Sequence, residues 1–129
     1  MASLIGSRVE RKEDKKFLTG KGRYTADINL VHQTYAVFIR SPHARAKINS
    51  VKISAALKAP GVVTIFTGDD IVREKIGGLI AGWKIVSQDG SDMKVPNHPP
   101  LAKDCVNYVG DHVAVVIAES LEEAKAAAE

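Results

Sequence analysis

The sequence predicts a fold that mixes β-strands with short α-helices. Several short segments are rich in β-branched and aromatic residues, and turn-forming residues separate them. Helix-forming segments lie between and after these strands, and two of them begin with a serine suited to capping a helix. The length of 129 residues, with 45% hydrophobic and 26% charged residues, fits one folded domain.

The first half of this pattern contains two strands and one helical turn. Residues 35–40 (YAVFIR) are apolar and rich in β-formers, which predicts a strand. Residues 47–53 (KINSVKI) predict a second strand, and a slip in their alternation indicates a bulge. Residues 54–59 predict a short helical turn with Ser54 as its N-cap, which the Pro-Gly pair at 60–61 ends.

The second half adds strands on either side of a long loop. Residues 62–66 (VVTIF) predict a compact, buried strand, and residues 67–71 predict a turn into a short helix with acidic residues at its start. Residues 77–100 carry repeated glycines and prolines and predict a loop that is functional or contacts another segment. A strand begins at Cys105, and residues 112–118 (HVAVVIA) predict the most hydrophobic strand.

The last ten residues predict a helix with a defined start. Ser120 and Glu123 form the spacing of a capping box, and strong helix formers follow them. Neither a C-cap glycine nor a cluster of basic residues follows. From this we expect the chain to be part of a longer polypeptide, truncated at this helix.

Charge divides the chain into a basic arm and a nearly neutral domain. Residues 1–23 carry seven Lys/Arg and three Asp/Glu, a net charge of +4, whereas residues 24–129 carry eleven and twelve, a net charge of −1. We therefore expect an extended or irregular arm over residues 1–21, followed by one domain over residues 24–129. A solvated arm is favoured over a nucleic-acid contact, because interleaved aromatic residues for base stacking are lacking.

Targeting signals and cysteine content place further limits. The N-terminus builds no apolar signal segment, and no apolar run is long enough for a membrane span. A single cysteine excludes a disulfide framework and a multi-cysteine metal cluster within the chain. We expect a cytoplasmic protein.

Residues 20–25 (GKGRYT) half-match a dinucleotide-binding fingerprint. The third glycine of that fingerprint is replaced by Thr25, and no predicted strand precedes it. A glycine turn before the domain is the favoured interpretation.

Four histidines and one thiol are the candidate metal ligands or nucleophiles. His98, Cys105 and His112 are too widely spaced for a short metal-binding motif, and Cys105 is predicted to be a small buried residue. His32 and His43 complete the set, and isolated structural residues are favoured over a ligand set. A Cys-His nucleophilic pair formed in space stays open, with no positive support.

Two polar segments have structural interpretations that outweigh catalytic ones. Residues 41–48 (SPHARAKI) could hold an anion, but a turn at the end of a strand with exposed cations is favoured. Asp69 and Asp70 are better explained as helix capping than as a glycosidase pair, since adjacent residues rarely face one gap. The residues alone therefore assign no catalytic, cofactor-binding or metal-binding residue.

Taken in order, a series of short motifs resembles one family. The matching segments are residues 5–11, 13–14, 17–24, 27–28, 41–48, 59–62, 67–71, 100–102, 106, 108–111 and 113–120. The chain resembles the N-terminal part of the large, molybdopterin-binding subunit of the xanthine dehydrogenase/aldehyde oxidase family, and looks closest to the aerobic carbon monoxide dehydrogenase type. Residues 73–98 resemble the family least.

This resemblance implies an α/β-hammerhead domain, a mixed-sheet α+β unit at the front of a much longer subunit. The family's enzymes are oxidoreductases that act at molybdenum held by molybdopterin, as the cytosine dinucleotide in bacterial members. Electrons pass through [2Fe-2S] clusters to FAD on partner subunits or domains. The resemblance implies partners in the rest of the large subunit, the iron-sulfur small subunit and the FAD medium subunit. It carries no cofactor and no catalytic residue onto this chain.

Three hypotheses follow for this chain. The first is a structural and subunit-contacting domain of a molybdenum hydroxylase large subunit, inactive by itself, whose arm and loop pack on other domains or subunits. The second is an independent binding module that shares the fold. The third is a small enzyme that uses His43 or Cys105. The substrate (carbon monoxide, an aldehyde, a purine or an N-heterocycle) is not encoded in these residues.

Overall fold

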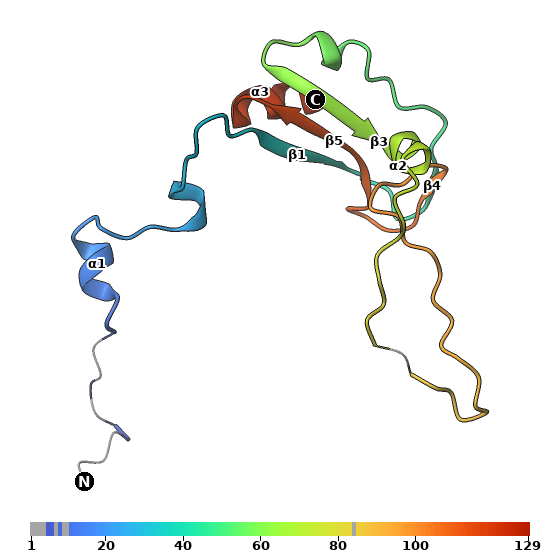
Figure 1. Ribbon diagram of the computed structural model, residues 1–129, viewed down its shortest axis with the longest axis horizontal. Helices are drawn as coiled ribbons and strands as arrows, with labels where there is room; N and C mark the ends of the chain where they lie inside the picture. The colour runs from blue at the N-terminus through green and yellow to red at the C-terminus, as the bar shows by residue number, and fades with distance from the viewer. Residues whose placement is uncertain (1–4, 7, 9–10, 84) are drawn as a thin grey trace. The chain divides into compact units, whose positions relative to one another are not determined.

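The computed structural model divides the chain into two units, residues 1–33 and residues 34–129 (Figure 1). It describes residues 5–6, 8, 11–83 and 85–129. The first unit contains helix α1 (Asp14–Leu18) and the 3-10 helix η1 (Thr25–Asp27). The prediction of an extended or irregular arm over residues 1–21 is therefore wrong for Asp14–Leu18, which form α1. None of the described helices combines the length and apolar character that a membrane span requires.

The end of α1 explains why a helix forms in so polar a segment. Gly20 has φ +69°, a left-handed conformation that glycine adopts without steric cost. Its N–H donates to the carbonyl of Phe17 at 3.1 Å, and the N–H of Lys21 donates to the carbonyl of Lys16 at 2.8 Å. This pair of bonds is a Schellman motif, which satisfies the last carbonyls of the helix.

The second unit is built on a three-stranded antiparallel sheet in the order β1-β5-β3. β1 is Tyr35–Arg40, β3 is Val62–Thr67 and β5 is His112–Ala118. These positions confirm the strands expected at residues 35–40, 62–66 and 112–118. β5, the most hydrophobic of the three, lies in the centre and pairs with both neighbours (Figure 1).

Helix α3 (Leu121–Ala128) packs on one face of this sheet. The expected cap is confirmed, because Ser120 Oγ accepts a hydrogen bond from the Glu123 N–H at 3.2 Å. The core on this face contains the buried residues Ile65, Val116, Ala118 and Ala124, with side chains of β1 packed against them. Val116 faces Val37 of β1 and Ile65 of β3 in the register.

The strand at residues 62–66 is buried on one face only, contrary to the expectation of a wholly buried strand. Val63 is 56% exposed and Phe66 is 42% exposed, whereas Ile65 is buried. β3 lies at the edge of the sheet, and α3 covers one face of it. Phe66 alternates onto the other face and consequently reaches solvent. Val63 lies at the register shift between Val62 and Thr64, where the alternation is interrupted.

Shorter elements connect these strands. The 3-10 helix η2 (Ala56–Lys58) precedes β3, and helix α2 (Gly68–Arg73) follows it, as expected. β2 (Ala46–Lys47) and β4 (Cys105–Val106) form a separate two-stranded antiparallel sheet.

Two expectations in the segment before β3 are wrong. The strand predicted over residues 47–53 ends at Lys47, since its partner β4 offers only two residues for pairing. Ser54 does not cap the following turn: the N-cap position is Ala55 and makes no side-chain bond. The Leu57 N–H instead donates to the carbonyl of Ile53 at 2.9 Å, so backbone alone closes this turn.

Residues 77–100 form the expected loop between α2 and β4 (Figure 1). The described part of this loop contains a single isolated bridge, between Val86 and Asp92, and no named helix or strand. Two side chains in it are strongly exposed: Ile80 at 93% and Trp83 at 79%.

Candidate functional site

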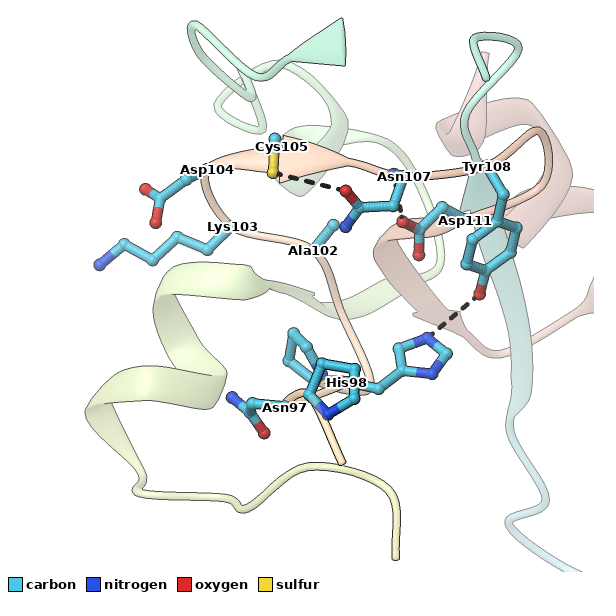
Figure 2. A pocket seen from close by; sticks show the side chains of 11 residues that line it. Asn97, His98, Ala102, Lys103, Asp104, Cys105, Asn107, Tyr108 and Asp111 are labelled. Carbon is cyan, nitrogen blue, oxygen red and sulfur yellow. Dashed lines mark hydrogen bonds between the residues drawn. The ribbon is translucent and has the colours of Figure 1, made fainter. Parts of the chain in front are cut away.

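A groove with a volume of about 530 Å³ lies where the long loop returns to the sheet. Its lining comes from residues 96–99 at the loop's end and from residues 102–111 around β4. Histidine, tyrosine, cysteine and carboxylate side chains meet here (Figure 2). It is therefore the natural place to look for chemistry.

His98 and Tyr108 form a pair across this groove. The Tyr108 hydroxyl lies 3.2 Å from His98 Nε2, and the two rings meet edge to face with centroids 5.9 Å apart (Figure 2). The loop is held close to this pair, because the Leu79 N–H donates to the His98 carbonyl at 2.8 Å. The geometry fixes the loop's base and engages Nε2 of His98 in the contact with Tyr108.

Asp111 has a structural role at the other side of the groove. Only 5% of the residue is exposed, and its carboxylate accepts a hydrogen bond from the Asn107 N–H at 2.9 Å. Its own carbonyl accepts from the Ser41 N–H, and the Gly110 N–H donates to the Ser41 carbonyl, each at 2.8 Å. These bonds tie the turn before β5 to the end of β1.

Cys105 is exposed, so the prediction of a small buried residue is wrong. It lies in β4 of the two-stranded sheet, where its neighbour Val106 takes the buried position at 2% exposure. The thiol lies 4.0 Å from the side-chain oxygen of Asn107. Figure 2 shows this contact and the His98–Tyr108 contact as two separate pairs. Among the described residues, the contact given for the Cys105 thiol is therefore with an amide oxygen and not with a base that would make it a nucleophile.

The remaining histidines are dispersed. His112 opens β5, and its ring lies against Phe38 with centroids 4.6 Å apart. His43 belongs to the turn after β1, and His32 lies in the first unit with φ 60°. Among the residues that the structure describes, no three His, Cys, Asp or Glu side chains are placed to hold a metal ion.

Residues 41–48 form the expected turn at the end of a strand. Ser41 is buried at 6% exposure, and its Oγ accepts a hydrogen bond from the His43 N–H at 3.0 Å. Arg40 donates from Nη1 to the Gly110 carbonyl at 3.2 Å. Arg45 and Lys47 are exposed and point to no shared acceptor in the described structure. This arrangement is a local hydroxyl turn and not a preformed anion site.

Asp69 and Asp70 lie in the first turn of α2 and have different partners. Asp70 accepts hydrogen bonds from the Thr67 N–H and hydroxyl, whereas Asp69 pairs with Lys103 at 3.2 Å. The hydrogen bond from the Thr67 backbone is the main cause that lowers the pKa of Asp70 below its ordinary value; the hydroxyl and Arg73 act in the same direction. The capping interpretation is confirmed.

The glycine-rich segment at residues 20–25 is a helix ending. Gly20 terminates α1, and the ring of Phe17 lies where a side chain on Gly22 would project. Phe17 in turn stacks on Tyr24, with ring centroids 5.2 Å apart. An aromatic pair therefore fills the space beside the glycines. In a dinucleotide-binding motif, the phosphates of the ligand occupy that space.

Comparison with known proteins decides the family. Residues 19–129 match the family model described as "Aldehyde oxidase and xanthine dehydrogenase, a/b hammerhead domain". The chain belongs to this family. The resemblance stated from the sequence motifs is thereby confirmed, and so is the small mixed α and β fold of the hammerhead domain, with its sheets and few short helices.

Individual relatives agree with this assignment. The hammerhead chain is 42% identical over 118 residues to the nicotine 6-hydroxylase large subunit of Paenarthrobacter nicotinovorans, which covers 92% of the chain and 14% of the relative. It is 39% identical over 67 residues to the carbon monoxide dehydrogenase large chain of Afipia carboxidovorans, covering 52% and 8%. The fold matches quinoline 2-oxidoreductase from Pseudomonas putida 86 with a TM-score of 0.79 and 35% identity, covering 95% and 15%.

The chain therefore spans a small part of these relatives' length. The candidate sites consist of contacts that stabilise the domain. They are the groove of His98 and Cys105, the turn at Ser41 and the acidic start of α2. Sequence reasoning missed the His98–Tyr108 pair, because ten residues separate them and no spacing motif links them.

Proposed function

We propose that this hammerhead chain is a structural and subunit-contacting domain of a molybdenum hydroxylase large subunit, and that it is not catalytic by itself. Two observations together support the proposal. Residues 19–129 match the family model, and the chain spans only 14–15% of the length of relatives such as the nicotine 6-hydroxylase large subunit. The printed names of these relatives describe oxidoreductases, and two of them are called a large subunit or large chain.

The cofactors belong elsewhere in this proposal. Family members are molybdenum enzymes with iron-sulfur and FAD partners. Molybdopterin holds the molybdenum in this family, and we assign its binding to the pterin-binding segments of later domains. The single cysteine cannot supply the four protein ligands that a [2Fe-2S] cluster takes. Molybdopterin, iron-sulfur clusters and FAD are therefore assigned to other domains or subunits.

The arm and the loop are the parts that we assign to contacts with those domains or subunits. The arm over residues 1–23 carries a net charge of +4. The loop over residues 77–100 exposes Ile80 and Trp83 at 93% and 79%. Leu79, Ile85 and Val86 beside them are exposed as well, and clustered exposed apolar residues are typical of contact sites. Both segments should lose solvent exposure in the intact enzyme.

Substrate choice is assigned to residues outside this domain. The relatives are named for nicotine, carbon monoxide and quinoline, yet they share this segment at 35–42% identity. A domain common to enzymes with such different substrate names is a poor candidate for the element that discriminates among them.

The proposal is tested on the purified chain of 129 residues. We expect no bound molybdenum by elemental analysis and no dye-linked dehydrogenase activity. Stoichiometric molybdenum together with turnover would overturn the proposal. The positive control is the large-subunit complex of a relative such as the nicotine 6-hydroxylase.

The alternative is an independent, non-enzymatic binding module that shares the fold. The two are separated by the reading frame in the source genome. Continuation through several hundred more residues into pterin-binding segments supports the large-subunit domain. A stop codon directly after Glu129 favours the independent module.

A further inference from the structure

One face of the main sheet is only partly covered in the described structure, where α2 and residues 100–101 lie against part of it. α3 covers the face that carries Val37, Ile65 and Val116. On the opposite face, Phe38 of β1 and Phe66 of β3 both stand opposite Val115 of β5 in the register. The two phenylalanines are 45% and 42% exposed. Two aromatic residues on either side of an aliphatic residue are typical of a sheet face that is buried. Here the two aromatic residues remain about half exposed to solvent.

This face deepens into a groove of about 250 Å³. The floor is formed by Phe38, Phe66 and Val115, and one wall is formed by Pro100 and Leu101. The other wall comes from α2 and the residues after it. Two carboxylates, Asp70 and Glu74, lie at its margin, and both are already ion-paired with Arg73. The groove therefore presents apolar surface and no free charge of its own.

The wall beside α2 is held in place by a helix ending. The Lys75 N–H donates to the Val72 carbonyl at 3.1 Å, and the Ile76 N–H donates to the Ile71 carbonyl at 3.0 Å. This Schellman motif brings Ile71 and Ile76 together at the groove. Lys75 adopts φ 54° to make the turn, although it is not glycine. The left-handed backbone at Lys75 is the turn that places Ile76 beside Ile71 in this wall.

We propose that this face, centred on Phe38, Phe66 and Val115, is the surface on which the remaining polypeptide of the large subunit docks through apolar side chains. The inference rests on the proposed function, since it requires a large subunit. It goes further by naming the contacting face and its occupant; of the arm and the loop, only Pro100 at the loop's end contributes to this face.

Length and chemistry favour the same polypeptide as the occupant. The chain spans 14% of the nicotine 6-hydroxylase large subunit and 15% of the quinoline 2-oxidoreductase chain, so most of each polypeptide lies outside the matched segment. A groove lined mainly by apolar residues resembles a permanent interface, whose centre is like a domain core. The contact that every such subunit must make is between this domain and its own continuation.

Hydroxyl-radical footprinting with mass spectrometry tests the proposal. Oxidation of Phe38 and Phe66 is compared in three samples: the 129-residue chain, the isolated large subunit and the complete enzyme complex. We expect oxidation to fall by at least about fivefold from the chain to the isolated large subunit, because the centre of such an interface excludes water. Addition of the other subunits should change it no further.

Several results would overturn the proposal. Strong oxidation in the complete complex would show that nothing covers the face. Protection that appears only when smaller subunits are added would assign it to them. Protection already present in the 129-residue chain would assign it to a second copy if it depends on concentration, and to the chain's own first unit if it does not. Absence of any longer reading frame would instead defeat the proposed function itself.

Matched variants provide a second test. Phe38→Glu and Phe66→Glu place a charge in the docking face, and Leu57→Glu is the control. Leu57 is 44% exposed and lies in η2, which packs beside α3 and not on the open face. In the 129-residue chain all three should fold, as judged by circular dichroism. In the large subunit, the two phenylalanine variants should reduce the soluble yield several-fold, and the control should not. Equal yields for all three variants would contradict the proposal.

Discussion

The carboxylate of Asp70 accepts two hydrogen bonds from Thr67, one from its backbone N–H at 2.7 Å and one from its hydroxyl at 2.9 Å. These bonds lock the junction at which β3 becomes α2. The junction is crowded, since a side chain on Gly68 would meet the backbone of Ala102. The Thr67–Asp70 pair therefore fixes the direction in which the chain leaves the sheet.

Asp70→Asn should lower the free energy of unfolding by about 1 kcal/mol at neutral pH, because the neutral amide accepts these bonds less strongly. Urea unfolding followed by circular dichroism measures the change. Asp69→Asn is the control: Asp69 is 78% exposed and pairs with the exposed Lys103, so its loss should change little. Equal effects of the two substitutions would contradict the role given to Asp70.

The same pair predicts a pH dependence. The folded structure lowers the pKa of Asp70, chiefly through the hydrogen bond from the Thr67 backbone. The unfolded chain therefore takes up the proton first as the pH falls. The stabilisation is complete above the ordinary aspartate pKa of about 4 and is lost as the pH falls below it through the folded value. Urea midpoints from neutral to acid pH should fall less steeply for Asp70→Asn than for the wild type.

Lys75→Gly should raise the free energy of unfolding by about 1 kcal/mol, because glycine adopts a left-handed backbone without the steric cost that a side chain incurs. Lys75 holds φ 54° after α2. The thermal midpoint reports the gain. Glu74→Gly makes the matched control, since Glu74 has φ −81° and glycine there should destabilise the helix end. A Lys75→Gly chain no more stable than the wild type would refute the argument.

Val116→Ala should lower the free energy of unfolding by roughly 2 to 3 kcal/mol, through lost burial and the cavity left behind. Val116 has 0% exposure and lies between Val37 and Ile65 in the central strand. Denaturant unfolding measures the loss. Val115→Ala removes the same atoms from the open face and should cost clearly less in the isolated chain. A reversed order would contradict the assignment of the two faces.

Cys105 should react with a thiol reagent such as DTNB while the chain is folded, because its side chain is exposed. The expected result is one thiol modified per chain without denaturant, with the circular dichroism spectrum unchanged. Asn107→Ala, which removes the side-chain oxygen that the thiol contacts, should leave the extent of labelling the same. A thiol that reacts only in denaturant would restore the buried placement.

The sheet and the last helix were predictable because their signals are local. The segments that became β1, β3 and β5 combine β-forming residues with clear turns at their ends. The capping box of Ser120 specifies the start of α3 within four residues. Patterns of this kind hold whatever the rest of the chain does.

The missed features depend on what lies elsewhere in space. α1 buries none of its residues, so no apolar periodicity marks it. Its sequence signals are Asp14 in the first turn, Lys15 and Lys16 in the last turn, and Gly20 after the helix end. The strand expected over residues 47–53 stops at Lys47, because the distant β4 determines the length of pairing. Cys105 and Val106 alternate between the faces of a two-stranded sheet, and the sequence does not say which of them turns inward.

The central position of β5 dictates when this domain can fold during synthesis. β1 and β3 each pair with β5 and not with one another. When the ribosome has synthesised both outer strands, the sheet cannot yet form because β5 is missing. Phe38, Phe66 and the core valine of β1 are exposed to solvent during this time. About 80 residues separate the end of β1 from the end of β5, which is several seconds of translation. Protection of the nascent chain over this interval falls to the ribosome and its chaperones.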